Sequence, residues 1–345
     1  MASIKIEEII THPATINNQT GSAGGVINSS VVLAEGQKGV VKDITNAQRI
    51  AGDTLYYKHF RKIGNPDNKI YGDAIMFLGE ILNGDYVINF RKGTFNDVWN
   101  DVSAARNYGC GTLNTALNAN DQTIIINTRG YTYDQFKNGD VLCVTSQINP
   151  EDTTGEIEYP RIDQEPTWNG DQVTVHIDTP LSYAYPVSRT VNDQLIKTRI
   201  ASCIEYGDVQ GTISTSDKTT AHGTVDESQV IVNSIAGTSQ TLTITFESGL
   251  DFNVVSNVSG LTLANGQKTS DYEPQNDDYL LPFLTIPADF WTNDGAGDWV
   301  AGDTVKIHTN PCAMAYWIVV DVPANSDASD LEMVSPYSNG TSGSS

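Results

Sequence analysis

The sequence predicts an all-β fold: a jelly-roll-like β-sandwich that carries a small inserted β-domain and has extended polar termini. Short runs of alternating or β-branched apolar residues recur along the chain, as is typical of strands. The dipeptide Gly-Asp occurs eight times at irregular spacing, mostly just before such a run. Both residues favour tight turns, so the irregular spacing indicates turns rather than a structural repeat. The one clear helical spacing is short and comprises Phe95, Val98, Trp99 and Val102.

Residues 1–30 are predicted to form an N-terminal arm. Residues 4–10 suit a short strand or an extended segment, whereas residues 17–25 are rich in Asn, Gly, Ser and Thr. Such a tract cannot bury enough apolar surface by itself, so its order depends on a partner surface. Residues 31–112 are predicted to be the first part of the sandwich, with strand patterns at 39–44, 51–63, 71–82 and 85–91.

Residues 113–197 are predicted to be the inserted β-module. Its clearest strand patterns lie at 123–127, 140–145 and 172–177, and an acidic, loop-like stretch at 151–165 separates the last two. Residues 181–186 close the module. We therefore expect it to interrupt the sandwich as a separate unit.

Residues 198–325 are predicted to be the second part of the sandwich. Strand patterns occur at 198–206, 228–235, 240–246 and 252–258, and the longest stretch runs from 281 to 323. Within it, Val305 and Ile307 alternate with polar neighbours, and residues 316–322 are nearly continuously apolar, as in a deeply buried strand. Three of the five tryptophans are expected at the centre of this core: Trp291, Trp299 and Trp317. Residues 326–345 are predicted to be a flexible polar tail.

The composition limits the class of partner. The chain has 345 residues, 42 acidic and 20 basic, which gives a net charge of −22. Such a surface repels phosphate backbones, so direct nucleic-acid binding is not expected. No apolar window reaches the roughly 18 residues of a membrane helix, and no signal-peptide pattern is found. We therefore expect assembly in a cytoplasm and no membrane partner. The cysteines form no Cys-x-x-Cys pair and are expected to be buried thiols: Cys110, Cys143, Cys203 and Cys312.

No catalytic or cofactor-binding pattern is found in the sequence. A Gly-x-Ser-x-Gly elbow and a phosphate-binding Gly-x-x-x-x-Gly-Lys loop are both missing, and the five histidines are scattered. We therefore predict no catalytic residue, no cofactor and no enzymatic activity. Acidic loops leave two alternatives open, weak calcium binding or a carboxylate pair for polysaccharide cleavage. The candidate loops contain Glu151, Asp152, Glu156 and Glu158; Asp271, Glu273, Asp277 and Asp278; and Asp294 and Asp298.

Four tyrosines are candidates for contact with a glycan or a partner protein. Tyr131 and Tyr133 form one alternating pair, and Tyr183 and Tyr185 form another. In an extended segment each pair lies on one face, where the rings offer a stacking surface. Tyrosine rings that pack at the edge of a hydrophobic core would give the same pattern.

Several segments resemble structural proteins of tailed bacteriophages and prophages. The similar segments are Ala51-Gly-Asp-Thr-Leu-Tyr-Tyr-Lys-His-Phe-Arg-Lys-Ile63, Arg199-Ile-Ala-Ser-Cys-Ile-Glu-Tyr-Gly-Asp-Val-Gln-Gly211, Phe283-Leu-Thr-Ile-Pro287, Trp299-Val-Ala-Gly-Asp-Thr-Val305, His308-Thr-Asn-Pro311, Trp317-Ile-Val-Val-Asp-Val-Pro-Ala324 and, in the insert, Asn138-Gly-Asp-Val141 and Trp168-Asn-Gly-Asp-Gln-Val173. The resemblance spans about residues 31–325. The chain departs from it at residues 319–321, where similar chains carry basic side chains.

The resemblance implies a virion protein without enzymatic activity, associated with the tail, neck or baseplate. Its partners would be other virion proteins and further copies of itself, arranged with cyclic symmetry. The termini are candidate arms, and strand addition is the expected mode of attachment. Head decoration and a receptor- or glycan-binding adhesin are the alternatives.

Overall fold

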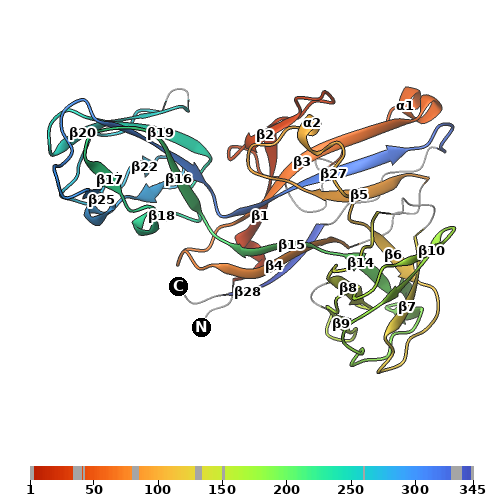
Figure 1. The fold of residues 1–345 in the computed structure, drawn as a ribbon. Helices are drawn as coiled ribbons and strands as arrows, with labels where there is room; N and C mark the ends of the chain where they lie inside the picture. The colour runs from red at the N-terminus through yellow and green to blue at the C-terminus, as the bar shows by residue number, and fades with distance from the viewer. Residues whose placement is uncertain are drawn as a thin grey trace.

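The protein folds into three β-modules, each with its own hydrophobic core (Figure 1). The structure is a computed structural model and describes residues 4–33, 41, 43–79, 85–128, 134–149, 152–258, 261–327 and 336–342. The strands pair antiparallel throughout this part of the chain, and the predicted all-β class is confirmed. Its α-helices are two short segments, α1 (Asn46–Ala51) and α2 (Trp99–Val102). The helical spacing at 95–102 thus yields a single turn. No helix among these residues is long and apolar enough to span a bilayer.

The central module is a sandwich of two sheets with the largest core between them. The larger sheet has the order β2 (Gly24–Ile27), β1 (Ile9–Ile16), β3 (Asp53–Ile63), β27 (Ala313–Val322) and β5 (Val87–Lys92). The facing sheet consists of β15 (Ile204–Val209), β4 (Tyr71–Leu78) and β28 (Pro336–Ser342). The strands β3 and β27 pair over ten residues, from Ala313 opposite Lys62 to Val322 opposite Asp53. They lie in the middle of their sheet and are buried on both faces.

The N-terminal segment belongs to this module and is not a projecting arm. Strand β1 pairs with β3, and the polar tract at 17–25 packs on the outer face of the sheet. There Gln19 exchanges two hydrogen bonds of 3.0 Å with the backbone of Tyr56, and Ala23 is buried beside Trp317. The partner surface that orders this tract is therefore the chain's own sheet.

The inserted module is a curled sheet around a separate core. Its strand order is β10 (Thr167–Asn169), β11 (Gln172–His176), β7 (Thr123–Asn127), β6 (Cys110–Leu113), β14 (Arg199–Ser202), β8 (Leu142–Thr145) and β9 (Ile157–Glu158). A bridge between Ile162 and Ile177 brings the two ends of the sheet together. The sheet thus begins and ends a few residues outside the predicted range of 113–197. A hairpin of β12 (Ser188–Val191) and β13 (Gln194–Lys197) turns at Asn192 and Asp193, both with positive φ.

Residues 212–310 form a third module, which we call the distal module (Figure 1). Its main sheet has the order β16 (Thr212–Thr219), β26 (Thr304–Asn310), β19 (Gln240–Phe246), β20 (Asp251–Ser256) and β21 (Gly266–Gln267). Three strand pairs complete the module: β17 (Gly223–Val225) with β25 (Trp291–Asn293), β18 (Ile231–Val232) with β24 (Leu284–Thr285), and β22 (Gln275–Asn276) with β23 (Leu281–Pro282).

The distal module corrects the prediction that 198–325 completes a single sandwich. Its strands pair with one another and bury their apolar faces inside the module, so two cores replace one. The tryptophans divide accordingly: Trp291 and Trp299 lie in the distal core, whereas Trp317 lies on the outer face of the central sheet. The tail also departs from its prediction, because Pro336–Ser342 forms strand β28. Residues 328–335 and 343–345 lie outside the described part.

The joint between the central and distal modules is polar and close-packed. Lys62, which is buried, donates hydrogen bonds to the carbonyls of Ile235 (2.5 Å) and Gly237 (3.0 Å). Burial lowers the pKa of this lysine to about 8. The Ser234 hydroxyl donates to the carbonyl of Asn65 on the central side. The distal module is therefore fastened by side-chain contacts as well as by the two chain crossings.

Gly211 lies at this joint, and its replacement is the first prediction. A Cβ on Gly211 would lie 2.6 Å from the Cβ of Val232, closer than side chains tolerate. Gly211→Ala is therefore expected to lower the free energy of unfolding by about 1–3 kcal/mol through overpacking. Urea denaturation followed by tryptophan fluorescence measures it. Gly64→Ala is the matched control at the same joint, since its Cβ would lie 3.7 Å from the nearest atom. Equal stability of the two variants would contradict the prediction.

Candidate functional site: a pocket between the inserted and central modules

A pocket of about 250 Å³ lies where the inserted module meets the smaller central sheet. Strands β4 and β28 form one side, and β8, β9 and β14 form the other. These strands meet because β14 of the inserted sheet continues through Cys203 into β15, the neighbour of β4. The lining residues are Phe77, Leu78, Gly79, Cys143, Thr145, Gln147, Asn149, Ile157, Tyr159, Arg199, Ala201, Tyr337, Ser338 and Asn339.

Three aromatic rings form one wall of the pocket. The ring centroid of Phe77 lies 6.3 Å from that of Tyr159 and 6.0 Å from that of Tyr337. Gly79 makes room for Tyr337, because a Cβ at position 79 would overlap the tyrosine ring. Burial raises the pKa of Tyr159 and also that of the Cys143 thiol. Both groups are therefore neutral at physiological pH.

The opposite wall is polar and held by hydrogen bonds. The backbone N–H of Gln147 donates to the Thr145 hydroxyl (3.1 Å), and its side-chain amide donates to the carbonyl of Gly155 (3.3 Å). Arg199 donates to the carbonyl of Gly79 (2.6 Å) and to that of Gln147. The guanidinium thus ties the two walls of the pocket together.

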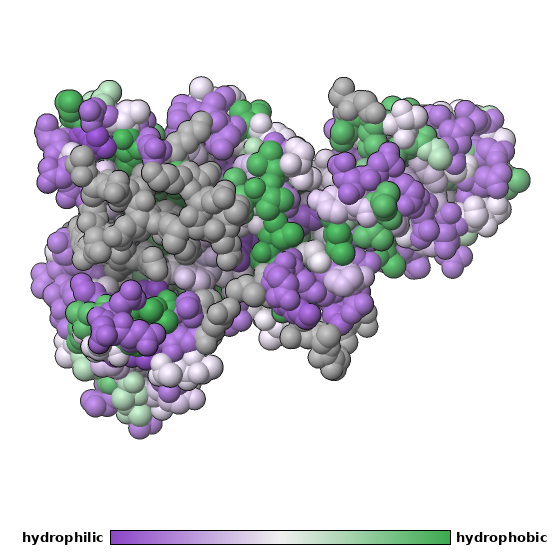
Figure 2. Space-filling model, turned by 180° about the vertical axis from the view of Figure 1, so that it is seen from behind, coloured by the Kyte–Doolittle hydropathy of each residue, from purple (hydrophilic) through white to green (hydrophobic). Residues whose placement is uncertain are grey.

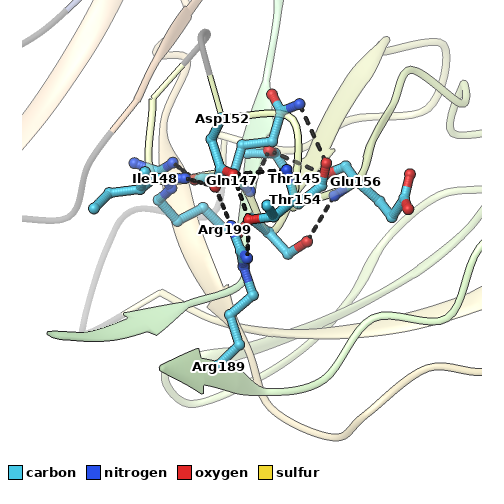
Figure 3. A network of polar contacts seen from close by, with 10 residues as sticks. Thr145, Gln147, Ile148, Asp152, Thr154, Glu156, Arg189 and Arg199 are labelled. Atoms are coloured by element: carbon cyan, nitrogen blue, oxygen red, sulfur yellow. Dashed lines mark hydrogen bonds and ion pairs between the residues drawn. The ribbon is translucent and has the colours of Figure 1, made fainter. Parts of the chain in front are cut away.

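A second set of contacts braces this polar wall from behind (Figure 3). The Asp152 carboxylate accepts hydrogen bonds from Ile148 N–H (2.9 Å) and from the Thr154 hydroxyl (2.6 Å), and it pairs with Arg189. Arg189 also donates to the Ser146 carbonyl at 2.6 Å. The Thr154 hydroxyl and the Ile148 N–H, followed by weaker partners that include the charge of Arg189, lower the pKa of Asp152. The 145–156 loop is thereby locked to the β12–β13 hairpin.

The predicted tyrosines do not form this site. Tyr131 and Tyr133 lie outside the described residues. Tyr183 is 46% exposed, but Tyr185 is fully buried in the core of the inserted module, where its hydroxyl donates to Glu158 at 3.1 Å. The pair does not share a face because the segment bends, and the N–H groups of Ser182 and Tyr183 both donate to the same Glu158 carboxylate. Tyr185 therefore offers no stacking surface.

Many of the carboxylates considered for calcium bond to protein donors instead. Glu158 binds the three donors just described, Asp294 pairs with His222 at 2.9 Å, and Asp298 pairs with Lys268. Across the described ranges, no three or more His, Cys, Asp or Glu residues are grouped so as to hold a metal ion. Glu151 lies outside those ranges. The four cysteines are free and buried, as predicted.

The sequence analysis did not single out the pocket residues. Tyr159, Arg199 and Tyr337 come from three distant parts of the chain, and Tyr337 was assigned to a flexible tail. No local spacing connects them. Comparison with family models, with curated proteins and with solved structures finds no match to this chain.

Proposed function

We propose that the chain is a structural, non-enzymatic component of a tailed phage particle, located at the tail, neck or baseplate. It acts by docking on copies of itself and on neighbouring virion proteins, in a ring of cyclic symmetry. The sequence resemblance over residues 31–325 supports the family, and the way in which the last strand is attached supports the mode of action. Head decoration is the alternative position in the particle.

The attachment of β28 is the observation that carries the proposal. This strand pairs along the edge of β4, from Pro336 opposite Leu78 to Ser342 opposite Tyr71. It is the last strand of its sheet and brings one large apolar side chain, Tyr337. A polar segment held largely by a backbone ladder is the arrangement used in strand addition between proteins.

The receiving edge is shaped for this strand. Gly79 leaves space for Tyr337, and Gly340 of β28 lies against the Tyr71 ring, where a Cβ would be 2.7 Å from the nearest ring carbon. Arg61, buried in the central module, donates a hydrogen bond to the carbonyl of Pro336. Side chains of both strands therefore hold this pairing within the chain, and its register shifts once, between Asn339 and Thr341.

Exposed apolar side chains support docking at further surfaces. They occur on all three modules, and Figure 2 shows a band of hydrophobic residues near the middle of one face, beside a largely hydrophilic distal module. The most exposed are Ile50 and Val32 on the central module, Leu195 on the inserted module, and Ile231, Val255, Leu280 and Val300 on the distal module. The contiguous band, rather than the scattered single side chains, is the kind of surface that favours protein contacts.

Immunogold labelling of particles from the producing lysate tests the proposal. An antibody raised to this chain is expected to place gold at the tail, neck or baseplate. Gold over the head surface would replace the tail position with head decoration. Particles that carry no gold, with the antigen left soluble, would overturn the virion proposal.

A substitution at Gly79 tests whether the edge of β4 is shaped for β28. Gly79→Ala forces a Cβ into the Tyr337 ring, so β28 is expected to detach from β4 while the remaining modules stay folded. Hydrogen exchange measured by mass spectrometry would then speed up over residues 336–342 and along β4. Gly249→Ala is the control, since its Cβ would meet ordinary contact at 3.4 Å. Unchanged exchange over 336–342 in the Gly79 variant would show that the edge is not specific for β28.

A further inference from the structure

The pocket between the inserted and central modules is a built binding site whose walls differ in chemistry. Phe77, Tyr159 and Tyr337 present ring surface on one side. Thr145, Gln147 and Asn149 bring a hydroxyl and two amides from the inserted module, and Asn339 of β28 adds a third amide. The Thr145 hydroxyl already donates to the Glu156 carbonyl and the Gln147 amide to the Gly155 carbonyl, so these two groups can offer a ligand only their remaining capacity. Each amide is both donor and acceptor, so together they match groups that donate and accept in the same way.

The pocket carries little net charge for its ligand. Among the residues that the structure describes, its lining contains no aspartate, glutamate or lysine. Arg199, the one cationic group in this described lining, donates to the carbonyls of Gly79 and Gln147 and so holds the pocket walls together. The phenol of Tyr159 and the thiol of Cys143 are neutral, as described above. A chain with net charge −22 also disfavours anionic ligands at long range.

The walls are held in place before a ligand arrives. The Asp152–Arg189 pair locks the loop that carries Gln147 (Figure 3). Arg199 donates to the Gln147 carbonyl and to the Gly79 carbonyl, and so ties that loop to the central module. A fixed wall costs less ordering free energy on binding than a mobile one. The volume of about 250 Å³ lies below the roughly 300–1,000 Å³ of sites for drug-sized ligands, so the ligand is small.

We propose that this pocket binds one neutral sugar ring of a glycan. A sugar ring has an apolar C–H face that stacks on aromatic rings and a rim of hydroxyls that donate and accept, which matches the two walls. The proposal does not rest on the virion assignment, because it concerns the isolated chain. It places glycan contact at Tyr159 and Tyr337 instead of the four tyrosines singled out by the sequence.

Saturation-transfer-difference NMR on the purified full chain tests the site. The probes are neutral hexoses, pentoses and N-acetylhexosamines at millimolar concentration, with glucuronate and uridine as charged and nucleoside comparators. We expect transfer to at least one neutral sugar and a Kd about tenfold higher in Tyr337→Leu, which keeps apolar bulk under β28 but removes the ring. Asn339→Ala, at an exposed edge of the pocket, is expected to weaken binding similarly. Tyr183→Ala, an exposed tyrosine outside the pocket, is the matched control and is expected to bind as the unaltered chain does.

Four results would overturn the proposal. One is the lack of transfer to every neutral sugar. Another is binding that survives both Tyr337→Leu and Asn339→Ala. The third is a preference for uridine or glucuronate over all neutral sugars. Loss of binding in Tyr183→Ala alone would move the glycan contact to the exposed tyrosine and would equally contradict the pocket.

Discussion

Asp97→Ala is expected to destabilise the central module by about 3–5 kcal/mol, because it leaves a buried ammonium group without its counter-charge. Lys58 Nζ lies 2.5 Å from Asp97 Oδ1, and the side chains are 0% and 6% exposed. The same lysine also donates to the backbone carbonyls of Gly25 and Asp97. Burial lowers the pKa of Lys58, and Asp97 opposes that shift. Removal of the carboxylate therefore removes the strongest interaction that keeps the lysine charged.

The measurement is urea denaturation followed by the fluorescence of Trp317, which packs beside this pair. Lys306→Gln is the control, because the pair of Lys306 with Asp217 is 40% and 63% exposed and water screens it. The urea concentration at the unfolding midpoint is expected to stay unchanged in that variant. The double variant Lys58→Met/Asp97→Ala removes both buried charges, so it is expected to cost less than Asp97→Ala alone. A double variant as destabilised as Asp97→Ala would show that the unpaired ammonium group is not the source of the loss.

The stability of the protein is expected to fall as the pH drops from 6.5 toward 3, and His59 is the main local cause. This side chain is fully buried in the central core, and burial lowers its pKa from 6.5 to about 3. The unfolded chain thus binds a proton that the folded chain excludes. The contribution of the neutral His59 ring to the free energy of unfolding is complete above pH 6.5. Below that value the free energy of unfolding falls by about 1.4 kcal/mol per pH unit.

His59→Phe removes this titration while keeping a ring of similar size. Between pH 6.5 and 4.5 its unfolding free energy is expected to fall by about 3 kcal/mol less than that of the unaltered chain. His12, whose pKa burial also lowers, supplies part of the slope that remains. Tyr316→Phe is the control, because this neighbouring ring lies 5.8 Å from His59 and does not titrate in the range. Equal slopes in His59→Phe and the unaltered chain would contradict the assignment.

The sequence predicted strands well where apolar and β-branched residues are concentrated. Residues 51–63 and 316–322 were predicted as strands and fall within β3 and β27 or overlap them closely. What the pattern missed is that β3 is covered on both faces. The N-terminal tract covers Lys58, and the distal module covers Lys62. Packing between segments that are distant in the sequence does not change the alternation of apolar and polar residues along one strand, so that alternation cannot predict it.

The division into three modules was missed for a related reason. The chain passes between the central and distal modules without a long linker, at Gly211 in one direction and at Pro311 in the other. The pocket was missed because its lining comes from five strands spread between residues 71 and 342. Only the three-dimensional pairing of β4 with β28, and of β14 with β8, brings those side chains together.

The ten-residue ladder between β3 and β27 has a mechanical consequence. Strand β26 of the distal module leads through Pro311 directly into β27, so a pull on the distal module is transmitted along the strand. Such a pull loads the hydrogen bonds of the ladder in shear, all at once, and β27 is also paired with β5 on its other side. The joint contacts of Lys62 and Ser234 are few and would yield first. Under tension the distal module would therefore move or stretch while the central sandwich stayed folded. The distal module is thus the compliant end of the molecule, and the central sandwich is the stiff part.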